Sequence, residues 1–168
     1  MCHKLCSNLN FNLISAPLLA AGHSLQIEAA PNLTLHTVPE ALTEALTRIL
    51  ANVLDHAFAD KEKGVLTIRA RRSSEVEAGT AATEGAVQAN EAQEGIIITI
   101  NDNGCGIAAA DLPKVLDPFF TTKSGIGGHV GLGLHVAFNH ITQRLKGKLG
   151  VASVEGEGTT VTICLNHA

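Results

Sequence analysis

The sequence predicts an α+β fold, a two-layer sandwich in which helices cover one face of a β-sheet. Strand-like and helix-like segments alternate along the 168 residues, but without the regular βαβ rhythm of a doubly wound fold. Hydrophobic residues make up 45% of the chain and charged residues 17%, so most of the chain is expected to fold. A chain of this length suits a single domain with a core of its own.

The first predicted elements are a hairpin and a long helix. In residues 24–37 apolar and polar residues alternate around a Pro-Asn turn, which predicts a β-hairpin. Pro39 and Glu40 then open a helix, because proline is tolerated in the first turn and an acidic residue there suits the helix dipole. Up to Ala57, apolar residues recur at three- and four-residue intervals, so one side of this helix is expected in the core.

The rest of the chain supplies the remaining strands and a second helix. A continuous β-branched run at 96–100 is typical of a strand buried on both faces. Residues 73–95 contain almost no large apolar side chain, so we expect a flexible connection there. The other predicted elements are a strand at 65–70, an amphipathic helix at 132–145, and a closing hairpin of 148–154 and 159–165 around a Glu-Gly-Glu-Gly turn.

Composition argues against several classes of partner. The net charge of −4, with only 12 Lys and Arg, argues against a nucleic-acid footprint. No apolar run reaches the roughly 18 residues that a membrane span needs, so we expect no membrane contact by this domain. Four scattered cysteines and the lack of a secretory signal favour a reducing cytoplasm.

The first candidate site lies where the predicted strand at 96–100 runs into a glycine-containing turn. Asp102 stands there, and a carboxylate at this point can accept a hydrogen bond from the exocyclic amine of adenine, whereas guanine would present a carbonyl oxygen. Gly104 and Gly106 lack the Cβ atoms that would hold the backbone away from a purine, and they tolerate positive φ. The alternative is an ordinary Asp-Asn-Gly turn without a ligand.

The second candidate site is the glycine-rich run at 125–134, which leads directly into the second helix. Free N–H groups at a helix N-terminus bind anions once glycines let the chain approach, so this pattern predicts a phosphate site. A P-loop would need Gly-Lys-Ser/Thr, which is absent, and a dinucleotide fingerprint beginning at Gly131 would need Gly or Ala at Val136. The alternative is a flexible linker.

The third candidate site lies on the polar side of the first helix. Glu44, Arg48, Asn52 and His56 follow one another at four-residue steps and so share a stripe. Asn52 offers a neutral oxygen suited to Mg²⁺, which prefers few protein ligands supplemented by phosphate oxygens and water. The alternative is a solvated face on which Glu44 and Arg48 form an exposed ion pair.

Taken in order, four motifs resemble the N, G1, F and G2 boxes of histidine kinase catalytic domains. They are Asn52, residues 102–106, residues 117–123 and residues 131–134. The likeness spans roughly residues 24–165 and implies the Bergerat ATP-binding fold shared with gyrase-type ATPases and MutL, a mixed sheet covered on one face by about three helices. It implies an N-terminal segment at 1–23 and an ATP-binding catalytic domain at 24–168, with the flexible insertion at about 73–95 and an ATP lid at about 117–130.

By this resemblance the chain is a protein-histidine kinase domain that uses ATP and Mg²⁺. Asp102 would hold the adenine amine and Asn52 the magnesium, while residues 127–133 would hold the phosphates and Lys123 would meet the γ-phosphate. Asn52 and Lys123 would thus be the catalytic residues. The implied nucleotide-binding residues are Asn52, His56, Asp102, Gly104, Gly106, Ile107, Lys123, Gly127, Gly128, Gly131, Leu132, Gly133 and Thr159.

The attacking histidine would belong to another domain. None of the eight histidines lies in a long helical hairpin ahead of the nucleotide site, so we expect the phosphoacceptor helices outside this chain. The isolated domain is then expected to bind nucleotide yet autophosphorylate poorly. Its implied partners are the histidine-bearing dimerisation domain of the same kinase and a response regulator. Its implied location is the cytoplasm, either free or within a protein anchored to the inner membrane.

Two features depart from the family pattern. The family helix usually carries two asparagines four residues apart, so Asn52 corresponds either to the second, with Arg48 at the first, or to the first, with His56 at the second. We favour the former. His129 and Val130 stand where a single Thr commonly precedes the Gly-Leu-Gly-Leu run. Two alternatives therefore stay open: a nucleotide-sensing module without kinase activity, and a gyrase-like ATPase, which needs a carboxylate base where Arg48 stands.

Overall fold

The fold is built on one mixed five-stranded β-sheet. The computed structural model describes residues 2–4, 11–31, 33–59, 61–75, 95–121 and 130–166. In spatial order the strands are β2 (Ser24–Ala29), β4 (Val65–Arg72), β5 (Gly95–Asp102), β7 (Gly158–Asn166) and β6 (Lys148–Val154). β2 pairs with β4 in parallel, and the other pairings in this sheet are antiparallel.

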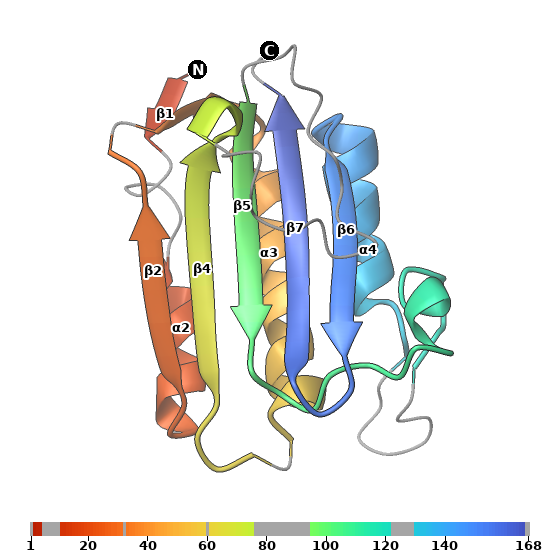
Figure 1. Cartoon of the computed structure of the whole chain (residues 1–168). Helices are drawn as coiled ribbons and strands as arrows, with labels where there is room; N and C mark the ends of the chain where they lie inside the picture. The colour runs from red at the N-terminus through yellow and green to blue at the C-terminus, as the bar shows by residue number, and fades with distance from the viewer. Residues whose placement is uncertain are drawn as a thin grey trace.

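Three helical segments cover one face of this sheet and lie behind it in Figure 1. They are α2 (Phe11–Ala20), α3 (Pro39–Asn52) with its π-helical continuation η1 (Val53–Ala57), and α4 (Gly133–Asn139) with its π-helical continuation η4 (His140–Arg144). The remaining short elements are the strands β1 (Cys2–Lys4) and β3 (Thr34–His36) and the 3-10 turns η2 (Ser73–Glu75) and η3 (Leu112–Lys114). The predicted two-layer α+β sandwich is confirmed.

Most of the predicted elements are confirmed. The helix opening at Pro39 is α3 with η1, and the helix predicted at 132–145 is α4 with η4. The strands predicted at 65–70 and 96–100 are β4 and β5, and the closing hairpin is formed by β6 and β7. The prediction that β5 is buried on both faces holds for its first half only: on the face away from the helices Ile97 is 7% exposed, but Thr99 is half-buried and Asn101 is exposed.

The predicted hairpin in residues 24–37 is wrong. β2 forms a parallel ladder with β4, and β3 pairs in antiparallel fashion with β1. The β2–β4 ladder continues past the strand to a hydrogen bond from the Ala30 N–H to the Ala70 carbonyl (3.0 Å). Alternation of apolar and polar residues identifies a strand but says nothing about its partner, so the sequence pattern could not distinguish the two pairings.

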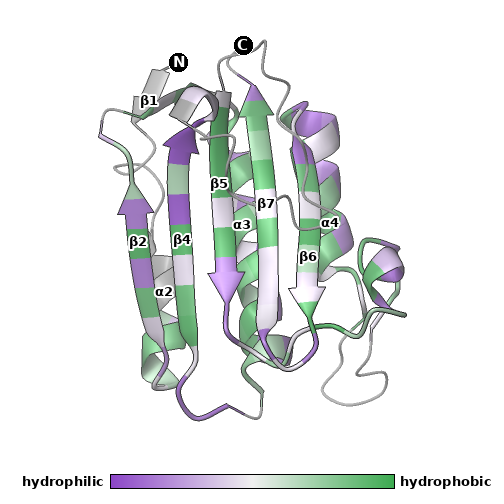
Figure 2. Ribbon diagram, viewed as in Figure 1, coloured by the Kyte–Doolittle hydropathy of each residue, from purple (hydrophilic) through white to green (hydrophobic). Residues whose placement is uncertain are grey.

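The hydrophobic core fills the space between the sheet and the helices. The central strand β5 contributes Ile96, Ile98 and Ile100, each at most 2% exposed, and α3 contributes Leu46 and Ile49. In Figure 2 the hydrophobic colour is concentrated on α3 and on parts of β5 and β7, whereas β2 and β4 become hydrophilic toward their C-terminal ends. Burial of this kind is the main force that holds β5, and therefore its last residue, in place.

Two predicted segments fall largely outside the described residues. The flexible insertion at 73–95 and the lid at 117–130 include residues 76–94 and 122–129, which the structure does not describe, so both stay predictions. Across the described ranges, no helix is long and apolar enough to cross a membrane.

The helix α2 packs on the same core as the rest of the domain. Leu18 is completely buried among core residues. His23, which follows α2, is buried as well; its Nδ1 accepts a hydrogen bond from the Gly64 N–H (2.9 Å), and its ring lies 4.7 Å from that of Phe58, centroid to centroid. Residues ahead of 24 therefore contribute to the folded unit.

Leu18→Ala should lower the free energy of unfolding by about 2–5 kcal/mol, because it opens a cavity in a close-packed core. Leu19→Ala is the matched control, since Leu19 is the next residue of α2 but is 58% exposed. Its substitution should change stability by about 0.5 kcal/mol or less. Urea denaturation followed by circular dichroism measures both values, and equally small changes would contradict the packing of α2 on the core.

Candidate functional site

Asp102 ends β5 as a buried carboxylate. Its side chain is 5% exposed. Oδ1 accepts hydrogen bonds from the backbone N–H groups of Gly104 (2.8 Å) and Thr159 (3.3 Å). Both of these hydrogen bonds go to Oδ1. The other carboxylate oxygen, Oδ2, is therefore the one left to accept a hydrogen bond from a ligand.

The surroundings of Asp102 shift its pKa in opposite directions. Burial is the largest effect and raises the pKa of this carboxyl above its ordinary value of 3.8, while the bonds from Gly104 and Thr159 and the charge of Lys61 lower it. Lys61 lies between η1 and β4, and its ammonium donates to the Asn103 carbonyl oxygen. A buried acid with a perturbed pKa beside a cation is typical of functional sites.

The turn that follows Asp102 needs its glycines for contacts within the protein. A Cβ on Gly104 would lie 2.5 Å from the Ala57 Cβ at the end of η1. A Cβ on Gly106, whose φ is +68°, would lie 2.1 Å from the Val154 carbonyl oxygen. The predicted positive φ is therefore found at Gly106, and the close approaches that the structure shows are to the chain's own atoms. The turn is held between η1 and the β6–β7 hairpin.

Further hydrogen bonds fix both ends of this turn. Asn103 Oδ1 accepts a hydrogen bond from the Val65 N–H (2.8 Å), which joins the turn to the start of β4. Ile107, a predicted site residue, donates its N–H to Ser153 Oγ on β6 (2.9 Å). The backbone around Asp102 is therefore attached to strands on both sides of β5.

Asn52 lies opposite the start of α4. It is the half-buried last residue of α3, and a Cβ on Gly133 would lie 2.8 Å from its Oδ1. The C-terminal end of β5, the end of α3 with η1, and the start of α4 all lie at the same end of the molecule (Figure 1). The structure therefore brings Asp102, Asn52 and Gly133 to one region, as the sequence predicted.

Gly131, which follows the segment 122–129, lies against the backbone of Phe120, which precedes that segment. Its φ is +70°, and a Cβ there would lie 2.5 Å from the Phe120 carbonyl oxygen. Leu132 follows as the N-cap residue of α4. The predicted site residues outside the described part of the chain are Lys123, Gly127 and Gly128.

Comparison with known proteins identifies the family. Residues 37–168 match the family described as histidine kinase-, DNA gyrase B-, and HSP90-like ATPase. The chain belongs to this family. The resemblance drawn from the four motifs is thereby confirmed, and this member of the ATPase family is an ATP-binding domain.

Several relatives of this ATPase domain carry the name of sensor histidine kinases. The chain is 33% identical over 159 residues to the sensor histidine kinase ZraS of Salmonella typhi, which covers 93% of the chain and 28% of the relative. It is 29% identical over 132 residues to the sensor histidine kinase WalK of Bacillus subtilis (strain 168), which covers 76% of the chain and 18% of the relative. The chain thus spans less than a third of either relative.

Solved structures share the fold. The catalytic domain of histidine kinase ThkA, in a nucleotide-free form, superposes with a TM-score of 0.72 at 18% identity and covers 99% of this chain and 94% of its own. Full-length ShkA in complex with AMPPNP superposes with a TM-score of 0.71 at 17% identity and covers 100% of this chain and 31% of its own. These likenesses confirm the fold that was predicted for this chain.

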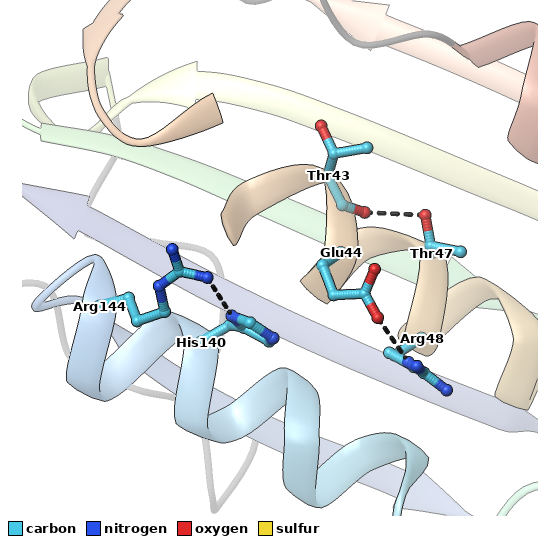
Figure 3. A network of polar contacts seen from close by, with 6 residues as sticks. All are labelled: Thr43, Glu44, Thr47, Arg48, His140 and Arg144. Atoms are coloured by element: carbon cyan, nitrogen blue, oxygen red, sulfur yellow. Dashed lines mark hydrogen bonds and ion pairs between the residues drawn. The ribbon is translucent and has the colours of Figure 1, made fainter. Parts of the chain in front are cut away.

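The four residues of the predicted polar stripe have different surroundings in the structure of this ATPase domain. Arg48 donates its Nε–H to Glu44 Oε1 (2.9 Å) with both side chains substantially exposed, as Figure 3 shows beside the Arg144–His140 contact on η4. His56 lies in η1, where the helix has changed to i→i+5 hydrogen bonds. Asn52, at the end of α3, lies against Gly133 at the start of α4. The exposed ion pair of Glu44 and Arg48 is therefore the correct interpretation of the first half of the stripe.

Sequence reasoning missed three residues that hold the site together. His135 on α4 places its Nδ1 2.9 Å from the Leu116 carbonyl oxygen, which only accepts, so this nitrogen carries the proton and fixes α4 to the chain before the predicted lid. Lys61 and Ser153 hold the turn after Asp102. Each of the three acts on a partner distant in sequence, so no local pattern could have identified them.

Asp102→Asn should weaken ATP binding at least about tenfold while leaving the free domain as stable as before or more stable. The amide keeps an oxygen for the two backbone donors but removes a buried charge. Because burial raises the pKa of Asp102, the ionised carboxylate destabilises the fold above that pKa, and this penalty disappears as the pH falls through it toward 3.8. Urea denaturation at about pH 7 and about pH 4 should therefore show the advantage of the variant shrinking on acidification. An advantage that grows would contradict burial as the dominant effect.

Lys61→Met should raise the pKa of Asp102 further, because it removes a positive charge that lowers this pKa. As the pH is lowered, ATP affinity should then start to fall at a higher pH than in the wild type. Lys61→Arg keeps the charge and serves as the control. Calorimetric titration with ATP over about pH 5–8 measures the three profiles, and coincident profiles for Met and Arg would rule out an electrostatic role.

Proposed function

We propose that this chain is the ATP-binding catalytic domain of a two-component sensor histidine kinase, which transfers the γ-phosphoryl group of ATP to a histidine on a separate dimerisation domain. The observation that carries the proposal is a buried acceptor, Asp102, at the same end of the fold as Asn52, which lies against Gly133 at the start of α4, in a chain 33% identical to a sensor histidine kinase. Adenine and phosphate would then bind at the same end of the sandwich.

Asp102 would recognise the base. Its Oδ2 would accept a hydrogen bond from the exocyclic amine of adenine, while Oδ1 stays bonded to Gly104 and Thr159. Guanine would turn a carbonyl oxygen toward the same carboxylate, which leaves two acceptors facing each other in a buried place. His56, Ile107 and the two glycines of the turn would line the rest of this pocket, as the family resemblance implies.

The start of α4 would bind the phosphates. Backbone N–H groups around Gly131, Leu132 and Gly133 open the helical segment that runs through η4 to Arg144, and the first N–H groups of a helix have no partners within it. By the resemblance, Gly127, Gly128 and Lys123 complete the phosphate contacts beneath a lid at about 117–130.

Asn52 would hold Mg²⁺ through its amide oxygen. Within the described ranges no group of three or more His, Cys, Asp or Glu side chains could hold a metal ion, so the protein would supply few ligands and the nucleotide phosphates and water the rest. Mg²⁺ prefers this arrangement, and a neutral amide oxygen suits it better than the imidazole of His56. Once bound, the ion would offset the negative charge of the phosphates.

The chain's own contribution to transfer would be positioning and charge stabilisation. In the reaction a bond forms between an imidazole nitrogen of the partner histidine and the γ-phosphorus, as the bond to the leaving ADP oxygen breaks. The transition state requires little covalent chemistry from the protein. Asp102 would fix the base and Lys123 would stabilise charge on the γ-phosphoryl group. A response regulator would then take the phosphoryl group from the histidine.

The residue identities argue against a gyrase-like ATPase. Such an enzyme needs a carboxylate base one helical turn before Asn52, and Arg48 stands there, bound to Glu44. A nucleotide-sensing module without transfer activity stays the rival that experiment must exclude.

The test uses the 168-residue chain with Mg²⁺, ATP radiolabelled in the γ position, and a purified two-helix domain bearing a phosphoacceptor histidine. The supplied domain should gain an acid-labile, base-stable label, and Asp102→Ala should abolish it. The chain alone should bind ATP with little labelling of itself. Binding without transfer would favour the nucleotide-sensing module, and steady hydrolysis by the lone chain would favour the ATPase.

A further inference from the structure

Three polar side chains form a row across the end of the sheet. Asp102 on β5 stands directly opposite Thr159 on β7, and Thr159 stands directly opposite Ser153 on β6. Directly opposite residues in an antiparallel ladder project on the same face and lie close together. This face is the one that carries the core residues Ile98 and Ile100, so the row lies on the helix side of the sheet.

The Ser153 hydroxyl has all of its hydrogen-bonding capacity in use. It donates to the Gly158 carbonyl oxygen (2.7 Å), accepts from the Ile107 N–H (2.9 Å), and lies 2.9 Å from Thr159 Oγ1. A hydroxyl has one proton and two acceptor positions. Because a carbonyl only accepts and a backbone N–H only donates, the third contact must use the remaining lone pair of Ser153.

The direction of the Thr159 hydroxyl follows from this count. Thr159 Oγ1 must donate its proton to Ser153, since Ser153 has no second proton to give. The lone pairs of Thr159 Oγ1 are then what this hydroxyl can offer to any other group. Thr159 is 9% exposed and bonds to Asp102 Oδ1 through its own N–H, so it borders the carboxylate at the edge of the proposed pocket.

We infer that Ser153 is a specificity-determining positioning residue, which acts through Thr159 to make this edge of the base pocket present hydrogen-bond acceptors only. The inference rests on the proposed nucleotide site. With the Thr159 proton held by Ser153, both Asp102 and Thr159 offer acceptors to the group at position 6 of the base, where adenine carries an amine and guanine a carbonyl oxygen. A free Thr159 hydroxyl could rotate and donate to the carbonyl oxygen of guanine, which would reduce the discrimination.

The inference is tested by the ratio of GTP to ATP dissociation constants, measured by calorimetry with Mg²⁺ on the whole chain. The wild type should prefer ATP by about 100-fold. Ser153→Ala should narrow the preference by about three- to tenfold, the effect expected of one hydrogen bond gained by GTP. A merely structural role would weaken both nucleotides by the same factor and leave the ratio unchanged.

Two sets of controls separate hydroxyl chemistry from packing. Thr160→Val alters the neighbouring residue of β7 on the opposite face, where Thr160 Oγ1 accepts from Asn101 Nδ2 (2.7 Å), and should leave the ratio unchanged. Ser153→Thr and Ser153→Val have the same shape and suit a strand, but only Thr keeps the hydroxyl. Ser153→Thr should keep the wild-type ratio of GTP to ATP dissociation constants, and Ser153→Val should narrow the preference for ATP. This comparison tests the inference even if Ser153→Ala does not fold.

The outcomes distinguish the two claims. If the wild type binds neither nucleotide, the proposed function fails. If the wild type prefers ATP but the ratio is the same for Ser153→Thr and Ser153→Val, the proposed function stands and the role of Ser153 is rejected.

Discussion

A single carboxylate held inside the fold is the constraint on which the end of this sheet depends. Burying an ionised group is unfavourable unless hydrogen bonds and nearby charge offset the loss of water. For Asp102 the donors come from Gly104 and Thr159, and the positive charge comes from Lys61. These three residues belong to a turn, a strand and a loop that are far apart in the sequence. These groups therefore offset part of the cost of burying the carboxylate, and they do so only when β4, β5 and β7 have come together.

Close packing around this carboxylate explains the positions of the glycines. A Cβ on Gly158 would lie 2.0 Å from the Asp102 carbonyl oxygen, and those on Gly104 and Gly106 would meet η1 and β6. The backbone that surrounds Asp102 thus has protein atoms on several sides and its polar groups in hydrogen bonds. A site built in this way is preorganised, so a ligand would have little ordering entropy to overcome on binding.

Local patterns predicted what depends on local physics. The periodicity of apolar residues gave α3 and α4 correctly, and a buried strand ending at a glycine turn identified Asp102. The pairing of β2 was missed, because the parallel ladder with β4 follows from tertiary packing that alternation does not encode. Ser153 and Lys61 were missed for a related reason: their partners lie 46 and 42 residues away along the chain. The family resemblance supplied roles for site residues, but not these supports.

One helix connects the two halves of the proposed site. The end of η1 contacts the turn after Asp102 through Ala57, while Asn52, five residues earlier on the same continuous helix, lies against Gly133 at the start of α4. A displacement of this helix would therefore alter the base pocket and the proposed metal ligand together. The change from α to π hydrogen bonding falls between these two contacts, and single π turns of this kind are frequent at functional sites. At about 3.6 residues per turn, side chains five residues apart on a helix point about 140° away from each other, so one continuous helix can present Asn52 to the start of α4 and Ala57 to the turn after Asp102.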